Sequence, residues 1–139
     1  ERSRAAGVSM IPTSTSAAGQ LGKVLPDLSA RLTVAALRVP AISVSAIDLV
    51  LQLSDWPTDD VKDTIGTMVR TSGVMASVDD ACVSSDLRGR PESLILATRE
   101  TQVLEDKQIR LFGWYDNEWG FSARMLDLAR LMADRKTAP

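Results

Sequence analysis

The chain contains no histidine and only one cysteine among its 139 residues. Histidine is the usual general base near neutral pH, so Ser/His/Asp and Cys/His catalytic pairs within this chain are excluded. A histidine-containing metal site is excluded as well, and one cysteine cannot build a thiolate cluster. Nor can one cysteine form an internal disulfide, which is compatible with a reducing cytoplasm.

Strong charge of one sign and long apolar runs are also missing. The 16 basic and 18 acidic residues give a formal net charge of −2, so nothing indicates a nucleic-acid partner. Uninterrupted apolar stretches are only a few residues long, so no membrane-spanning helix is expected. Hydrophobic residues make up 45% and charged residues 24%, which is typical of a globular domain.

The clearest strand pattern covers residues 43–53. Leucines at 49, 51 and 53 alternate with polar or charged residues such as Asp48 and Gln52, and a period of two predicts a half-buried strand. Further strands are expected at 33–39, 81–85, 94–98, 101–104 and 108–115, with 101–104 pairing back on 94–98 across Arg99 and Glu100. The first pattern favours an antiparallel or mixed sheet with one face against helices.

Three helices are expected. The first covers residues 17–24, after the hydroxyl-rich segment 13–16 and before Pro26. The second begins near Thr58 and ends at Gly73. The third covers about 118–134 and carries one apolar stripe, formed by Phe121, Met125, Leu128 and Met132. Several antiparallel strands with a few helices on one face predict a single α+β domain over residues 1–139.

Six short stretches of the sequence carry a resemblance to a known family. They are Arg2-Ser-Arg-Ala-Ala6 with Ile11-Pro-Thr-Ser-Thr-Ser-Ala-Ala18, Gly22-Lys-Val-Leu-Pro26, Leu37-Arg-Val-Pro40 with Val44-Ser-Ala-Ile-Asp-Leu49, and Trp114-Tyr-Asp-Asn-Glu-Trp-Gly120. In this order and spacing they resemble the C-terminal part of phosphorylating glyceraldehyde-3-phosphate dehydrogenases and the closely related erythrose-4-phosphate dehydrogenases. The resemblance covers nearly the whole chain.

The resemblance implies a glycolytic oxidoreductase that oxidises and phosphorylates an aldehyde phosphate. In that family a cysteine thiolate attacks the aldehyde, histidine takes the proton, hydride passes to NAD, and phosphate releases the acyl group. This chain begins downstream of that cysteine, that histidine and the NAD-binding domain. No Gly-x-Gly-x-x-Gly follows a strand here. We therefore expect a C-terminal catalytic domain that lacks its N-terminal part and is inactive alone.

Four residues match phosphate contacts of the family: Arg2, Thr15, Ser16 and Arg38. Ser16 stands where the family has glycine. Arg38 lies in an apolar stretch, where an unpaired buried charge costs several kcal/mol, and its planar fork suits phosphate. The alternatives are solvated arginines at a frayed terminus, an ordinary N-cap cluster, and an ion pair between Arg38 and Asp48.

Two residues match the nicotinamide side of the family's cofactor site. Asn117 corresponds to the residue that hydrogen-bonds the nicotinamide carboxamide, and Phe121 stands where many relatives have tyrosine. On the sequence alone Asn117 is a turn or N-cap residue. Cys82 does not match the family nucleophile, and we expect it to pack in the core as a small hydrophobic residue.

The substrate and the role of the chain stay open between alternatives. Glyceraldehyde 3-phosphate is the family's commonest substrate, whereas residues 46–49 and 120–127 lean toward erythrose 4-phosphate. A stand-alone binding or assembly module is the non-enzymatic alternative. The family's sheet packs against another subunit, so a homo-oligomer through the sheet face in the cytoplasm is expected. Residues 88–93 depart from the family's Asp-Pro-His-Ser-Ser stretch. A Ser-x-x-Ser-Cys-Thr-Thr-Asn upstream of Glu1 would indicate an enzyme.

Overall fold

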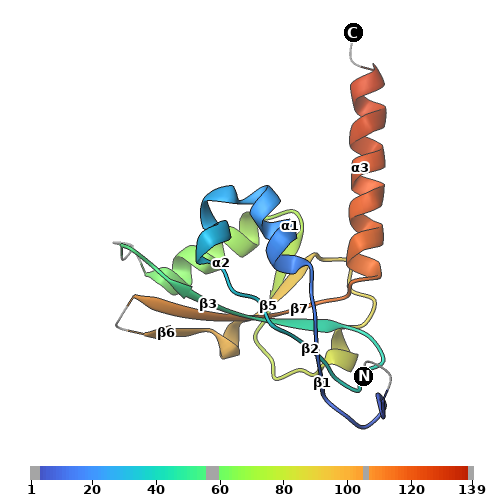
Figure 1. The fold of residues 1–139 in the computed structure, drawn as a ribbon. Coiled ribbons are helices and arrows are strands. Elements are labelled where there is room, and N and C mark those ends of the chain that lie inside the picture. Colours follow the sequence, from blue (N-terminus) through green and yellow to red (C-terminus); the bar gives the residue numbers. More distant parts are fainter. Residues whose placement is uncertain (1–3, 56–59, 105–106, 138–139) are drawn as a thin grey trace. The chain divides into compact units, whose positions relative to one another are not determined.

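The computed structural model describes residues 4–55, 60–104 and 107–137 (Figure 1). The chain forms two compact units, Glu1–Ile42 and Ser43–Pro139. Each unit has a sheet of its own, with two strands in the first and five in the second.

The first unit is a short hairpin-like ladder with helical turns between its strands. It contains β1 (Ile11–Thr13), α1 (Ala17–Val24), the 3₁₀ helix η1 (Pro26–Arg31) and β2 (Ala36–Arg38), and β1 pairs antiparallel with β2. The helix expected at residues 17–24 is confirmed. Pro26 starts η1, where its fixed φ fits the first position and its missing N–H is not needed.

The second unit is built on a mixed sheet. Its strands are β3 (Ser45–Gln52), β4 (Met75–Val78), β5 (Leu94–Ala97), β6 (Gln102–Leu104) and β7 (Gln108–Tyr115). The order is β3-β7-β5-β4, with β6 also paired to β7. Only β4 and β5 run parallel, and the other pairs are antiparallel. The α+β class and the mixed sheet are therefore confirmed.

The strand β3 keeps most of its expected alternation. Leu49 and Leu51 are partly shielded while Asp48 and Gln52 are exposed, but Ile47 is 43% exposed although it belongs to the leucine series. The Asp48 carboxylate accepts two hydrogen bonds from Arg110 on β7, from Nε and Nη2, each 2.8 Å long. This bidentate pair spans neighbouring strands on the exposed face.

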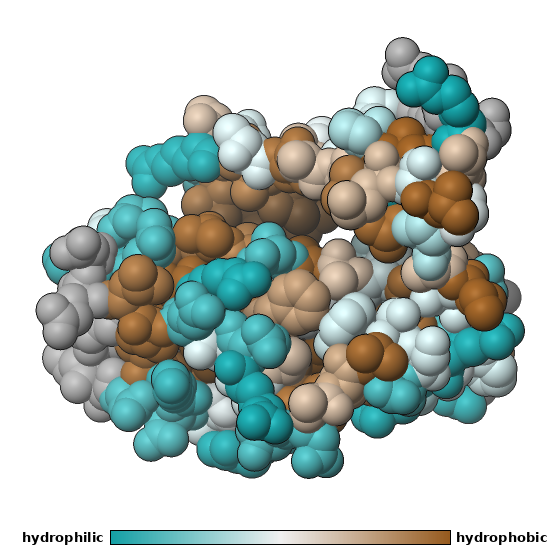
Figure 2. Space-filling view, turned by 90° about the horizontal axis from the view of Figure 1, so that it is seen from below, coloured by the Kyte–Doolittle hydropathy of each residue, from teal (hydrophilic) through white to brown (hydrophobic). Residues whose placement is uncertain are grey.

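Two helices complete the second unit, α2 (Val61–Thr71) and α3 (Trp119–Thr137). The cap of α2 is Asp60, whose Oδ1 accepts from Lys62 N at 2.8 Å, whereas the expected cap Thr58 lies outside the described residues. The expected apolar stripe of α3 is exposed rather than packed, and apolar atoms reach the surface at several places (Figure 2). No helix in the described part of the chain is both long and apolar enough to span a bilayer.

Two sequence expectations about short strands were wrong, and one strand was missed. Residues 81–85 form no strand; instead η2 (Ser84–Leu87) begins there, and Asp86 Oδ2 accepts from Val83 N at 2.8 Å. The strand β4 was not expected. Finally, β6 pairs with β7 instead of β5, because η3 (Thr98–Glu100) forms a helical turn where a hairpin turn was expected.

The core of the second unit is formed around β5. Val44, Leu87 and Ile95 are buried together, and Val78, Cys82 and Trp114 pack against them. Phe112 meets the Trp114 ring edge-on, with centroids 5.1 Å apart, an arrangement that aromatic pairs favour. Segments far apart in sequence therefore converge on one strand of four residues.

Ile95 is fully buried, so Ile95→Ala should lower the free energy of unfolding by about 2–5 kcal/mol, because it removes buried methyl groups and leaves a cavity. The measurement is urea unfolding followed by tryptophan fluorescence. Val50→Ala is the control: Val50 is exposed on β3, and its truncation should change stability by about 0.5 kcal/mol or less. Equal losses for both variants would contradict this location of the core.

Candidate functional site

The candidate site is built around the turn between β7 and α3. Asp116 is only 3% exposed, and its carboxylate accepts three backbone hydrogen bonds. Oδ1 accepts from Glu118 N at 3.0 Å and from Trp119 N at 3.2 Å, while Oδ2 accepts from Gly89 N at 2.9 Å. The same side chain thus caps α3 and ties it to a loop 27 residues earlier in the sequence.

These hydrogen bonds set the charge state of Asp116. The hydrogen bond from Gly89 is the largest influence and lowers the pKa of Asp116, and the N–H groups of Trp119 and Glu118 act in the same direction, whereas burial opposes them. Gly89 has φ of +80°, a conformation that glycine adopts without strain. The carboxylate is therefore ionised near neutral pH, and its oxygens are occupied by N–H donors.

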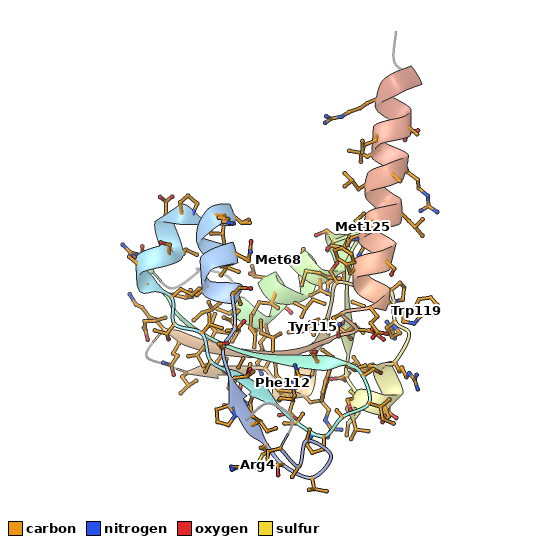
Figure 3. All side chains as sticks on the ribbon, turned by 45° about the vertical axis from the view of Figure 1, so that its right-hand side comes forward. Arg4, Met68, Phe112, Tyr115, Trp119 and Met125 are labelled. Carbon is orange, nitrogen blue, oxygen red and sulfur yellow. The ribbon has the colours of Figure 1, made fainter. Side chains whose placement is uncertain are left out.

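An open cavity of about 320 Å³ adjoins this turn. Its lining is Ser93, Tyr115, Asp116, Asn117, Gly120, Phe121 and Arg124. Tyr115 stands at the end of β7 and Trp119 at the base of α3, which locates the cavity in Figure 3. Both residues that the sequence assigned to the cofactor side, Asn117 and Phe121, line this cavity.

Asn117 and Phe121 present unused binding groups. Asn117 is exposed, and none of the described residues hydrogen-bonds to its side-chain amide. Phe121 is 66% exposed. A primary amide can donate and accept at once, which makes it complementary to a carboxamide, and an exposed ring offers a flat surface for stacking.

Arg124 of α3 also lines the cavity. Its Nη1 donates to Ser93 Oγ at 2.9 Å, and its Nη2 lies 2.7 Å from Asp127 Oδ2. The first turn of α3 packs closely on the same segment, since a Cβ at Gly120 would lie 2.9 Å from Glu92 O. Arg124 was not predicted from the sequence, where its only local signal is the i,i+3 spacing to Asp127.

The arrangement supports binding rather than proton transfer or nucleophilic attack. The Asp116 carboxylate is committed to three N–H groups, so it is not poised as a general base. Cys82 lies elsewhere: it is half-buried and packs against the core, which confirms its expected packing role, although the segment around it is not a strand.

The phosphate candidates lie in the first unit or outside the described residues. Arg2 is among the residues that the structure does not describe. Thr15 and Ser16 are exposed at the start of α1; Thr15 Oγ1 accepts from Ala17 N at 3.1 Å, and the Ser16 side chain makes no capping bond. Hydroxyls and N–H groups at a helix start are suited to an anion.

The expected burial of Arg38 was wrong. The strand β2 ends at this residue, and the side chain is exposed, because the ladder has only three residues and Pro40 soon follows. Asp48, the partner considered for Arg38, is paired with Arg110 within the second unit. Arg38 pairs in the ladder with Ile11 and Thr13 pairs with Ala36, so Arg38 stands at the end of the ladder away from Thr15.

Comparison with known proteins gives a consistent result. The family described as "Glyceraldehyde 3-phosphate dehydrogenase, C-terminal domain" matches residues 1–117. Glyceraldehyde-3-phosphate dehydrogenase 2 of Bacillus subtilis is 42% identical over 99% of this chain and 42% of its own length. Glyceraldehyde-3-phosphate dehydrogenase of Cereibacter sphaeroides is 42% identical over 94% of the chain and 40% of its own length. The cytosolic glyceraldehyde-3-phosphate dehydrogenase 2 of Hordeum vulgare is 40% identical over 96% of the chain and 45% of its own length. The chain thus spans less than half the length of these relatives.

Asp116→Asn should lower the free energy of unfolding by about 1–3 kcal/mol near neutral pH. Asparagine still caps α3, but one of its two side-chain oxygens becomes an NH₂ group, so the Gly89 N–H or a capping N–H loses its acceptor. Because folding lowers the pKa of Asp116, its stabilisation is present above the ordinary aspartate pKa of about 3.9 and is lost as pH falls through the folded-state pKa. The difference between wild type and variant should shrink on acidification.

The measurement is denaturant unfolding from pH 7 down to pH 2. Asp60→Asn is the matched control, since Asp60 caps α2 with a single hydrogen bond to Lys62 N and asparagine retains that acceptor. Its loss of stability should be the smaller of the two. A pH-independent difference between wild type and Asp116→Asn would refute the electrostatic role assigned to Asp116.

Proposed function

The chain belongs to the glyceraldehyde-3-phosphate dehydrogenase family, and we propose that it is the C-terminal catalytic segment of an NAD-dependent phosphorylating aldehyde dehydrogenase. In this proposal residues 1–139 act as one part of the catalytic domain, while the nucleophile, the base and the cofactor domain are contributed by other parts of the protein. The observation that carries the proposal is the free Asn117 amide beside Phe121 in one open cavity.

The residues around this cavity fit the carboxamide end of NAD. Asn117 has an unused donor and an unused acceptor for a carboxamide, and Phe121 has an exposed ring face beside it. When bound, NAD would supply the oxidising power for the aldehyde. This chain would contribute orientation: Asp116 holds the turn through backbone N–H groups, so Asn117 follows directly after a fixed residue.

Phosphate recognition is assigned to Thr15, Ser16 and Arg38, with Arg2 as a further contact. Their exposure leaves hydroxyls and a guanidinium accessible to an anion. A guanidinium presents a planar fork that matches two phosphate oxygens. Because Arg38 is exposed, its proposed role rests on the chemistry of its guanidinium and on the family resemblance.

Glyceraldehyde 3-phosphate is the proposed substrate, with erythrose 4-phosphate as the alternative. The relatives of Bacillus, Cereibacter and Hordeum are all named for glyceraldehyde 3-phosphate, which favours the former. Val50 is exposed on the face of β3 opposite the leucine series, which supports a homo-oligomer formed through that sheet face. Two plant relatives are named as cytosolic, which supports a cytoplasmic location.

The isolated chain should show no dehydrogenase activity, because it has no histidine and its single cysteine is packed against the core. The assay is NADH formation from glyceraldehyde 3-phosphate, NAD and phosphate, with a heat-killed sample as background and an intact relative as positive control. NADH formation above background by the chain alone would contradict the proposed dependence on residues supplied from elsewhere.

Arg38→Met should weaken phosphate binding to the chain by about tenfold or more, because a charge-assisted hydrogen bond contributes roughly 1.5–3 kcal/mol. Arg38→Lys should bind with intermediate affinity, since lysine keeps the charge but not the fork. The readout is an NMR titration with phosphate, in which the affinity is taken from the amide signals of Arg38 as well as from those of Thr15 and Ser16. Arg31→Met, an exposed arginine at the end of η1, is the control. Identical affinities for all four proteins would remove Arg38 from the phosphate site.

A further inference from the structure

A second cavity, of about 240 Å³, lies between α2 and the sheet, and all its lining residues belong to the second unit. The helix contributes Lys62, Gly66 and Arg70, and the strands β4 and β5 contribute Ser77 and Leu96. Val69 and Leu96 are buried and give it an apolar floor. The cavity thus combines two cationic groups and a hydroxyl with an apolar floor.

The Arg70 side chain folds back along the helix. Its Nη1 lies 3.1 Å from the place that a Cβ would occupy at Gly66, and its Nη2 donates to Thr67 Oγ1 at 2.8 Å. The guanidinium therefore lies over Gly66, one turn before its own Cα. Lys62 is one further turn back, about 6 Å along the helix axis from Gly66. Both cationic side chains consequently border the same short stretch of the cavity.

Neither cation is neutralised within the described part of the chain. No described carboxylate forms an ion pair with Lys62 or Arg70. The Thr98 hydroxyl is engaged with Val78 O at 3.1 Å and Asp79 Oδ1 at 2.6 Å, so the free donors are the Lys62 ammonium, the Nε and Nη1 of Arg70 and the Ser77 hydroxyl.

We propose that this cavity binds the phosphate group of a small phosphomonoester. A phosphomonoester carries a charge between about −1.5 and −2 near neutral pH, which matches the two cationic side chains. The guanidinium fork suits two phosphate oxygens, and lysine acts as a point charge beside it. The carbon part of the ligand contacts Leu96 and Val69. A cavity this small falls below the range of about 300–1,000 Å³ for drug-sized ligands, so the ligand is a small organic phosphate.

Gly66 gives the proposal a specific structural feature. Glycine weakens a helix at an interior position, but the space left by its missing side chain is where the Arg70 guanidinium lies. A larger residue at position 66 would fill this space and displace the guanidinium while strengthening the helix. Binding and stability should therefore change in opposite directions on substitution, which a purely structural role of Arg70 would not produce.

The test is an NMR titration of the ¹⁵N-labelled chain with β-glycerophosphate. The amide signals of residues 66–70, 77 and 96 should shift with one common affinity. Arg70→Gln should weaken that affinity at least tenfold, and Gly66→Leu should abolish it without lowering the midpoint of thermal unfolding. Arg135→Gln, which removes an exposed arginine from α3, is the matched control and should bind like the wild type.

Two results would overturn the proposal. The first is that only the amide signals of residues 15–18 and 38 shift. The phosphomonoester would then bind to the first unit and not in this cavity. The second is unchanged affinity in both Arg70→Gln and Gly66→Leu. If Arg70→Gln does not fold, Gly66→Leu decides alone, because it retains every charged group of the cavity. Shifts at residues 66–70 with no effect at residues 15 and 16 would support this site and count against the other.

Discussion

The buried carboxylate of Asp116 is the contact on which the candidate site depends. It joins the end of β7, the first turn of α3 and the loop at Gly89 through three backbone hydrogen bonds. A buried charge is tolerated only when hydrogen bonds replace its lost hydration, and three N–H donors meet that requirement. Asn117 and Phe121, two of the exposed residues that line the cavity, follow within five positions of this fixed point.

The close approach at Gly120 complements this anchor. Any side chain there would meet the Glu92 carbonyl oxygen, so the start of α3 can lie directly against residues 92 and 93. Arg124, one turn later, reaches Ser93 from the same helix face. Two contacts, at Gly120 and at Arg124, thus hold the first two turns of the helix against residues 92 and 93. The later turns are not needed to keep the shape of the cavity.

Elements with a strong local signal could be predicted from the sequence. The strand β7 was expected at its observed bounds, α1 likewise, and β3 within two residues, because alternation and breakers such as Pro26 act locally. The strand β4 could not be found in this way. It has only four residues and is defined by its parallel pairing with β5, which lies about twenty residues further along the chain.

The candidate site shows the same division between local and long-range information. Asn117 and Phe121 were identified from one contiguous segment, and the structure brings them into one cavity. The link from Asp116 to Gly89 spans 27 residues and leaves no mark in the sequence near either residue. The burial of Arg38 was predicted wrongly because apolar neighbours in the sequence do not indicate how many other strands pair with the strand that contains it.

Polar groups in this chain divide into those that hold the structure and those that remain available. The carboxylates of Asp48, Asp116 and Asp127 are saturated by arginines or backbone N–H groups. By contrast, the Asn117 amide and the Lys62 ammonium have no partner among the described residues. A satisfied group contributes rigidity, whereas an exposed unsatisfied donor loses little by exchanging water for a ligand. The binding capacity of the chain therefore lies in its amides, hydroxyls and cations, set on a frame that its carboxylates hold in place.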